Sequence, residues 1–365
     1  MKTRRTILCG MLAVMLALAF TACDDGLGGG GKSGGSKGKN GGGGDPTNWT
    51  AVADSTFGSD EFITGIAYGD GKFVAVGYES TVNIGGMNYI SYEGKMAYST
   101  DNGVTWTAVS EDDVYDSGFA AAAIRGITFG DGKFVAVGGS GTIAYSTDGI
   151  KWTKVTTSGF SSSAINAITY GGGKFVAVGD SQKTAHSTDG VTWTGVTIPD
   201  GIVIMQYADY TAIAYGGNKF VIGYGGLDVA YSTDVTKSTS WTAADRIPLK
   251  IEVIEDGDDV EVYEYQNWSN AIAYGGNKFV AGGQQGEMAY STDGIKWTGI
   301  LNGSFGTRAI IYGNNRFVAV GSRIAYSTNG TSWTAVADSP SGSAIAYGGN
   351  RFVIVGSGGK IAYSN

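Results

Sequence analysis

The chain has 365 residues, 62 of them glycine and only 4 proline, and its 33 acidic and 25 basic residues give a net charge of −8 at pH 7. A nucleic-acid partner requires a basic stripe that neutralises phosphates, and this acidic chain has none, so nucleic acid is excluded. Cysteine occurs only at positions 9 and 23, so the fold cannot depend on a set of disulfides.

The first 22 residues have the pattern of a secretory signal peptide. A basic start at residues 2–5 precedes an apolar run over 7–20, which is too short to span a membrane with these flanks. Cys23, directly after Thr-Ala, resembles the lipidated cysteine of the bacterial lipoprotein lipobox. The resemblance implies an exported chain that is lipid-anchored at Cys23 to the membrane of the bacterial cell envelope, on the periplasmic or surface side. An ordinary cleaved signal with an incidental cysteine is the alternative.

Residues 24–47 consist almost entirely of glycine, serine, lysine, asparagine and aspartate. Such a segment cannot bury enough apolar surface to offset the entropy lost on ordering. We therefore predict that residues 23–47 comprise the lipidated cysteine and a flexible tether, and that residues 48–365 form the folded domain.

Within this domain one sequence frame occurs seven times. Each copy has an apolar run ending in Tyr-Gly or once Phe-Gly, then a phrase like K-F-V-A-V-G, then one like A-Y-S-T-D-G, and in six copies a final W-T. The second phrase is marked by Phe73, Phe134, Phe175, Phe220, Phe279, Phe317 and Phe352. Repeats of this length are typical of solenoids and propellers, and each copy holds four short β-type runs between turn residues. No helical periodicity follows residue 22, so we predict an all-β, seven-bladed β-propeller with four antiparallel strands per blade.

The ends of the domain predict how the ring closes. The seventh copy stops at Asn365 without its W-T strand, whereas an orphan strand of the same type, Asn48–Val52, opens the domain. We predict that this N-terminal strand completes the last blade, because closure leaves few exposed strand edges. One tryptophan then serves each blade, namely Trp49, Trp106, Trp152, Trp193, Trp241, Trp297 and Trp333. We expect the closed ring to be a monomer.

The turn before most of these tryptophans carries a conspicuous aspartate. Residues 99–106 read S-x-D-x-G-x-T-W, and other copies are one residue shorter. This turn resembles the Asp-box, or BNR repeat, of sialidase-like propellers in the wider WD40/YVTN-like superfamily. An aspartate here accepts backbone N–H groups, glycine supplies an unusual backbone angle, and tryptophan packs between blades. We interpret the following residues as structural rather than catalytic: Asp101, Asp148, Asp189, Asp234, Asp293 and Asn329.

Three insertions interrupt the frame, all on the face that carries the loops between second and third strands and the crossings between blades. They cover residues 78–95, 111–123 and 243–270, and the last contains a hairpin pattern around an Asp-Gly turn. Loops on a rigid scaffold usually carry binding. The candidate binding residues in these insertions are Tyr89, Tyr92, Asp112, Asp113, Glu255, Asp256, Asp258, Asp259, Tyr263 and Trp268.

A second candidate site is the mouth of the central channel, where the innermost strands begin. The equivalent positions are all polar, namely Thr64, Arg125, Asn166, Thr211, Asn270, Arg308 and Ser343. We select Arg125 and Arg308 as candidate binding residues, and a hydrated channel rim is the alternative.

Acidic residues are concentrated in two of the insertions. Residues 252–264 hold seven and residues 111–116 hold four. The acidic run over residues 252–264 lacks the spacing of an EF-hand and is typical of a solvated face, so no metal or other cofactor is predicted. A Ca²⁺ ion or a cationic partner is the alternative.

These features predict a non-enzymatic binding or scaffold module that engages a protein or a glycan through the face with the insertions. The Asp-box resemblance leaves two alternatives. One is a sialidase-like glycoside hydrolase, which would need an arginine triad, a tyrosine nucleophile with a glutamate beside it, and an aspartic acid. Arg125, Arg308 and Arg246 are available for the triad, but no Tyr–Glu pair can be assigned. The other is an assembly factor for envelope complexes, since some Asp-box propellers assist in building membrane complexes.

Overall fold

A computed structural model describes most of the chain beyond the predicted tether. The described residues are 45–84, 87–199, 202, 209–224, 228–245, 251–256, 259–264, 269–283, 286–300 and 305–365. The predicted signal peptide, Cys23 and residues 24–44 lie outside them, as do Arg246, Asp258 and Trp268. Within the described ranges, no helix is both long and apolar enough to cross a bilayer.

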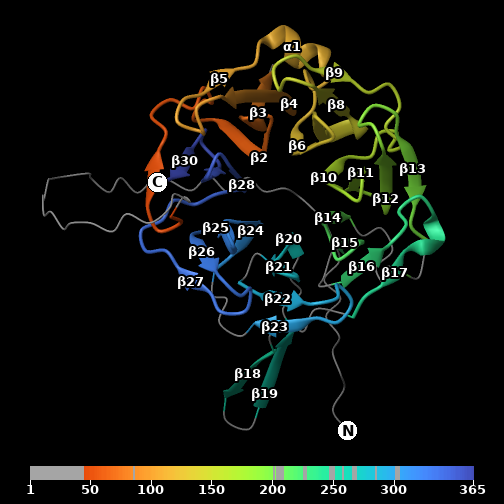
Figure 1. Ribbon diagram of the computed structural model, residues 1–365, viewed down its shortest axis with the longest axis vertical. Coiled ribbons are helices and arrows are strands. Elements are labelled where there is room, and N and C mark those ends of the chain that lie inside the picture. The colour runs from red at the N-terminus through yellow and green to blue at the C-terminus, as the bar shows by residue number, and fades with distance from the viewer. Residues whose placement is uncertain are drawn as a thin grey trace, which may run out of the picture. The chain divides into compact units, whose positions relative to one another are not determined.

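Seven four-stranded antiparallel sheets stand around a common centre, which confirms the predicted seven-bladed propeller (Figure 1). The innermost strand of each sheet is listed here in chain order: β2 (Glu61–Gly69), β6 (Ile124–Gly130), β10 (Ile165–Gly171), β14 (Tyr210–Gly216), β20 (Ser269–Gly275), β24 (Thr307–Gly313) and β28 (Ala344–Gly348). The second strands are β3 (Lys72–Ile84), β7 (Lys133–Gly138), β11 (Lys174–Gly179), β15 (Lys219–Tyr224), β21 (Lys278–Gly283), β25 (Arg316–Gly321) and β29 (Arg351–Val355).

The outer half of each blade is shorter. The third strands are β4 (Met87–Ser99), β8 (Ile143–Ser146), β12 (Lys183–Ser187), β16 (Asp228–Ser232), β22 (Met288–Ser291), β26 (Ile324–Ser327) and β30 (Ile361–Ser364). The outermost strands are β1 (Trp49–Ala51), β5 (Thr107–Ala108), β9 (Thr153–Lys154), β13 (Thr194–Thr197), β17 (Thr242–Ala243), β23 (Thr298–Ile300) and β27 (Thr334–Ala335).

The two ends of the domain are joined in one sheet, as predicted. Strand β1 pairs antiparallel with β30, with Thr50 opposite Tyr363, and the sheet order is β1-β30-β29-β28. Two backbone hydrogen bonds extend the pairing, from Asp45 N to Asn365 O at 2.7 Å and from Asn365 N to Asn48 O at 3.0 Å. The N-terminal strand therefore completes the seventh blade.

The hydrophobic core lies between neighbouring blades and not within one sheet. Side chains alternate along a strand, so one face of each sheet packs on the blade before it and the other on the blade after it. Val74 on β3 packs with Phe134 on β7, whereas Phe73 on β3 packs with Val353 on β29, and all four are fully buried. The cluster that Phe73 shares with Val353 closes the core across the two ends of the domain.

A glycine at the end of each innermost strand lies under an aromatic ring of the next blade. A methyl group at any of these glycines would overlap that ring, so a side chain cannot be accommodated. The pairs run around the whole ring: Gly69 with Phe129, Gly130 with Tyr170, Gly171 with Tyr215, Gly216 with Tyr274, Gly275 with Tyr312, Gly313 with Tyr347, and Gly348 with Tyr68. This contact explains why an aromatic residue and a glycine recur together at the end of the first phrase of the frame.

The insertions take three different forms. The first lengthens β3 and β4 into a long hairpin, and the third contains the predicted hairpin of β18 (Ile251–Asp256) and β19 (Asp259–Glu264), which forms a separate sheet. The second forms the helix α1 (Glu111–Asp116), which the periodicity of the sequence did not indicate. Two short 3₁₀ turns, η1 (Gly139–Gly141) and η2 (Ser238–Ser240), complete the described elements.

Candidate functional site

The mouth of the central channel and the insertions lie on the same face of the propeller. Each innermost strand begins at this face, and each second strand ends there, so the loops that follow the second strands surround the mouth. A cavity of about 250 Å³ opens at the mouth. Its lining includes six of the seven polar positions expected there: Thr64, Arg125, Asn166, Thr211, Arg308 and Ser343. The side chain of the seventh, Asn270, is outside the described part of the structure.

Arg125 is held at the mouth by a chain of polar contacts that involves three neighbouring blades. Its guanidinium donates a hydrogen bond to the side-chain oxygen of Asn166. The amide nitrogen of Asn166 donates in turn to Asp180 Oδ1 at 2.8 Å and to Tyr210 O at 3.0 Å. This chain orients the Arg125 side chain and provides both cationic and amide groups at the rim.

A second carboxylate, Asp209, adjoins this chain. It accepts a hydrogen bond from the Ser181 backbone N–H at 3.3 Å. Burial raises the pKa of Asp209, the negative charge of Asp180 raises it further, and the Ser181 N–H and the charge of Arg125 oppose the shift. A carboxyl group with a raised pKa beside a second carboxylate and an arginine makes this part of the rim chemically distinctive.

Three aromatic side chains lie on the first blade beside the mouth. The rings of Phe62 and Tyr78 are stacked with centroids 5.3 Å apart, and Tyr78 meets Tyr92 edge-on at 5.4 Å. Burial raises the pKa of Tyr78, the Tyr92 hydroxyl adds to the shift, and the positive charge of Arg125 opposes it. Phe62 remains 38% exposed, so the cluster of Phe62, Tyr78 and Tyr92 presents aromatic surface next to a cation.

The structure brings some of the predicted binding residues together and separates others. Arg125 and Arg308 line the same mouth, and Tyr92 belongs to the aromatic cluster beside it. Asp112 and Asp113 lie on α1, where the Asp113 carboxylate accepts a hydrogen bond from the hydroxyl of the N-cap residue Ser110. The capping contact gives Asp113 a structural role at the start of this helix.

The remaining predicted residues are described only through their strands or not at all. Tyr89 lies on β4, Glu255 and Asp256 on β18, and Asp259 and Tyr263 on β19, and their side chains are outside the described part. Arg246, the third arginine of the glycosidase alternative, lies in one of the gaps between the described ranges.

Sequence reasoning missed Phe62, Tyr78, Asp180 and Asp209. One signal was present for two of them. The residue directly after the second phrase of the frame differs from copy to copy, and it includes Tyr78 and Asp180. In the first and third blades this position lies beside the mouth, so a comparison of it among the copies could have identified both side chains.

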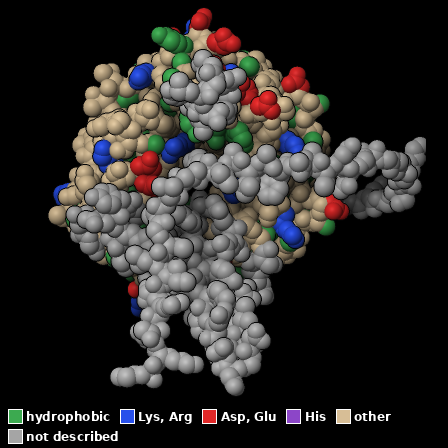
Figure 2. Space-filling view, turned by 180° about the vertical axis from the view of Figure 1, so that it is seen from behind, with side chains coloured by type: hydrophobic (Ala, Val, Ile, Leu, Met, Phe, Trp, Pro, Cys, Tyr) green, Lys and Arg blue, Asp and Glu red, His purple; other side chains and the backbone are tan. Residues whose placement is uncertain are grey.

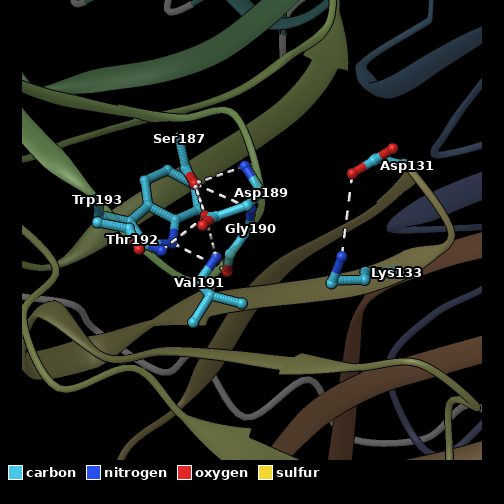
Figure 3. A network of polar contacts seen from close by, with 8 residues as sticks. All are labelled: Asp131, Lys133, Ser187, Asp189, Gly190, Val191, Thr192 and Trp193. Carbon is cyan, nitrogen blue, oxygen red and sulfur yellow. Dashed lines mark hydrogen bonds and ion pairs between the residues drawn. The ribbon is translucent and has the colours of Figure 1, made fainter.

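The turns with the aspartates of the repeated frame, which precede the tryptophans, lie on the opposite face, and their polar groups are engaged within the turn. In the third blade, Asp189 Oδ1 accepts hydrogen bonds from Thr192 N at 2.7 Å, Val191 N at 2.8 Å and Ser187 Oγ at 2.9 Å (Figure 3). The hydrogen bond from Thr192 N is the main cause of the low pKa of Asp189, about 2. The indole N–H of Trp193 donates to Gly190 O at 3.1 Å, so the tryptophan is tied to the same turn.

The other predicted turn residues make related contacts. Asp101, Asp148 and Asp293 accept backbone N–H groups of the same turns, and hydrogen bonds also outweigh burial in lowering the pKa of each. The side-chain oxygen of Asn329 accepts hydrogen bonds from two backbone N–H groups, both at 2.9 Å. Asp234, in the lengthened turn, forms an ion pair with Lys237 at 3.1 Å. Across the described ranges, His, Cys, Asp and Glu form no group of three or more that could hold a metal ion.

Comparisons with known proteins agree with this architecture. A family model described as the DUF6242 beta propeller domain matches residues 112–252. A comparison with curated proteins finds no match.

Several solved structures have a similar fold. One, described as YCF48 bound to D1 peptide, is 12% identical, with a TM-score of 0.58, and the match covers 88% of this chain and 95% of that one. YCF48 from Cyanidioschyzon merolae is 14% identical, with a TM-score of 0.60 over 87% and 99% of the two chains. The computationally designed protein Ika8 is 14% identical, with a TM-score of 0.51 over 86% and 98%. At these identities the likeness is one of fold, and the chain is a seven-bladed β-propeller.

Proposed function

We propose that this chain is a lipid-anchored binding and scaffold module of the cell envelope, which holds a protein partner through the face that carries the insertions. The observation that carries the proposal is the aromatic cluster of Phe62, Tyr78 and Tyr92 beside a channel mouth that is lined by Arg125. Tyrosine and arginine are enriched among residues that dominate binding energy, because each combines a large apolar surface with polar groups. A glycan is the second class of ligand that such a surface suits.

Two further observations support a protein partner. The additions to the frame are concentrated on this face, where the long hairpin of β3 and β4 and the helix α1 enlarge the surface beyond the ring. In addition, one propeller with a similar fold is described as bound to a peptide.

Site-specific photocrosslinking tests the proposal in the cells that produce the protein. A photoreactive phenylalanine replaces Phe62 at the mouth, and in a matched chain it replaces Val104 in the Asp-box turn of the same blade. These positions are equally accessible, at 38% and 36% exposure, but lie on opposite faces. We expect a specific protein adduct from position 62 and none from position 104. Equal adducts at both positions, or none at position 62, would contradict the proposal.

The lipid anchor is tested separately. We expect the wild-type chain to incorporate a fatty-acid label and to sediment with membranes, and Cys23→Ser to do neither. A Cys23→Ser chain that keeps the label would overturn the anchor but leave the crosslinking result unaffected.

A further inference from the structure

A pocket of about 430 Å³ lies at the outer edge of the face with the insertions, next to α1 and away from the channel mouth. Its volume is in the range of sites that bind small ligands or single side chains. The apolar part of the lining includes Phe57, Met96, Val109 and Val114, and the last three are almost completely buried. Tyr115 on α1 stands at its edge and is 73% exposed.

The charged part of the lining is strongly acidic. Glu61, Glu93, Glu111 and Asp112 face a single cation, Lys95. Lys95 Nζ lies 3.9 Å from Glu61 and 3.7 Å from Glu93, and it is closest to a further carboxylate, Glu79, at 3.3 Å. Burial alone would lower the pKa of Lys95, but the hydrogen bond to Glu79 and the surrounding carboxylates outweigh it and raise this pKa.

The single ammonium group of Lys95 therefore cannot neutralise all of the neighbouring carboxylates, and the pocket keeps an excess of negative charge. A concave site with apolar walls concentrates the field of such charges. Figure 2 shows the same combination at the surface, with acidic and hydrophobic side chains gathered at the upper edge, where α1 lies in Figure 1.

From this combination we infer that the pocket receives a lysine or arginine side chain of the protein partner, an inference that rests on the proposed binding function. Such a side chain has a long apolar stem that suits Met96, Val109 and Val114 and a cationic head that suits the carboxylates at the rim. The exposed ring of Tyr115 offers an additional cation–π contact. A negatively charged or purely apolar segment would leave the acidic side chains without a counter-charge.

The test uses the full chain and a defined probe, acetyl-Gly-Arg-Gly-amide, with its citrulline counterpart as an uncharged control of the same shape. Binding is measured by ligand-observed NMR. The pocket variant carries Glu93→Gln and Asp112→Asn, two exposed carboxylates whose loss should leave the core intact. The matched control carries Asp70→Asn and Asp131→Asn, which remove the same charge from exposed turns on the opposite face.

We expect the arginine peptide to bind more tightly than the citrulline peptide and the pocket variant to weaken arginine binding roughly tenfold, with no effect in the control. Raising the salt concentration should weaken wild-type binding more than binding to the pocket variant. Equal binding of the two peptides, or an unchanged affinity in the pocket variant, overturns the inference. Tighter binding of spermidine than of the arginine peptide also overturns it, because it assigns the pocket to a free polyamine.

Crosslinking from position 62 in the pocket variant separates this inference from the proposed function. A partner adduct that persists undiminished in the variant overturns the inference while the binding function stands. Absence of any adduct in the wild-type chain contradicts the binding function. The peptide measurements alone then decide whether the pocket binds a cationic side chain.

Discussion

The aromatic ring of Tyr68 in the first blade lies directly over the backbone of Gly348 in the last blade, 280 residues away along the chain. The same contact joins each of the other six neighbouring pairs of blades, so the junction between the chain ends is packed like every other junction. The ring is thus closed by the same side-chain packing that holds its interior, in addition to the pairing of β1 with β30.

Replacing Gly348 by alanine should destabilise the protein by about 1–3 kcal/mol, because the added methyl group forces the ring of Tyr68 out of its position. The matched control is Gly58→Ala, since a methyl group there meets nothing closer than 3.8 Å. Urea denaturation measures the free energy of unfolding of both. If the two variants unfold at the same urea concentration, the contact has no role in closure.

Removing the N-terminal strand should open the seventh blade. A chain that starts at residue 53 loses β1 with Trp49, and β30 is left with an unpaired edge, whereas a chain that starts at residue 45 keeps the whole sheet. We expect the shorter chain to lose at least about 3 kcal/mol of stability and to aggregate through its exposed edge. Thermal melting and light scattering measure both effects. Identical melting of the two chains would show that β1 is dispensable.

The Asp189 turn should contribute stability that depends on pH. Hydrogen bonds from the backbone hold the folded-state pKa of Asp189 at about 2, below its ordinary value of 3.8. A depressed carboxyl pKa contributes stability that is present above the unfolded pKa and is lost as the pH falls from about 4 to about 2. We therefore expect the gap in unfolding free energy between wild type and Asp189→Asn to shrink over this range.

Two variants separate the charge of Asp189 from its hydrogen bonds. Asparagine keeps the acceptor, as Asn329 shows in the sixth blade, so Asp189→Asn should be mild at pH 7. Asp189→Ala loses the hydrogen bonds as well and should cost about 1–2 kcal/mol. A gap between wild type and Asp189→Asn that stays constant from pH 7 to pH 2 would rule out the charge contribution.

The pKa of Asp209 at the channel mouth should depend on the charges of its neighbours Asp180 and Arg125. Burial and the charge of Asp180 both raise the pKa of Asp209, so Asp180→Asn should lower it, whereas Arg125→Gln should raise it. NMR titration of the side-chain carboxyl carbon of Asp209 measures this pKa in the wild type and in each variant. The Asp70→Asn variant on the opposite face serves as the control and should leave the pKa of Asp209 unchanged. The same pKa in all four proteins would mean that these groups do not interact.

The number of blades, the strands in each blade and the closure by Asn48–Val52 could all be predicted from the sequence. These features depend on local patterns, because alternating apolar residues and turn residues specify a strand or a turn within a few positions. The missing last strand of the seventh copy and the extra strand at the start can both be recognised directly in the amino-acid sequence. The helix α1 was missed because six residues are too few to show a helical period, although Ser110 and the acidic first turn are an ordinary capping signal.

The composition of the candidate sites was decided only by the tertiary structure. Phe62, Tyr78 and Tyr92 come from three strands of one blade, and Arg125 bonds to Asn166 of the next blade, so nothing in their spacing shows these contacts. Lys95 likewise meets Glu61 across the blade. Such contacts depend on strand register and on the packing of one blade against another, which bring together residues that are distant in the chain.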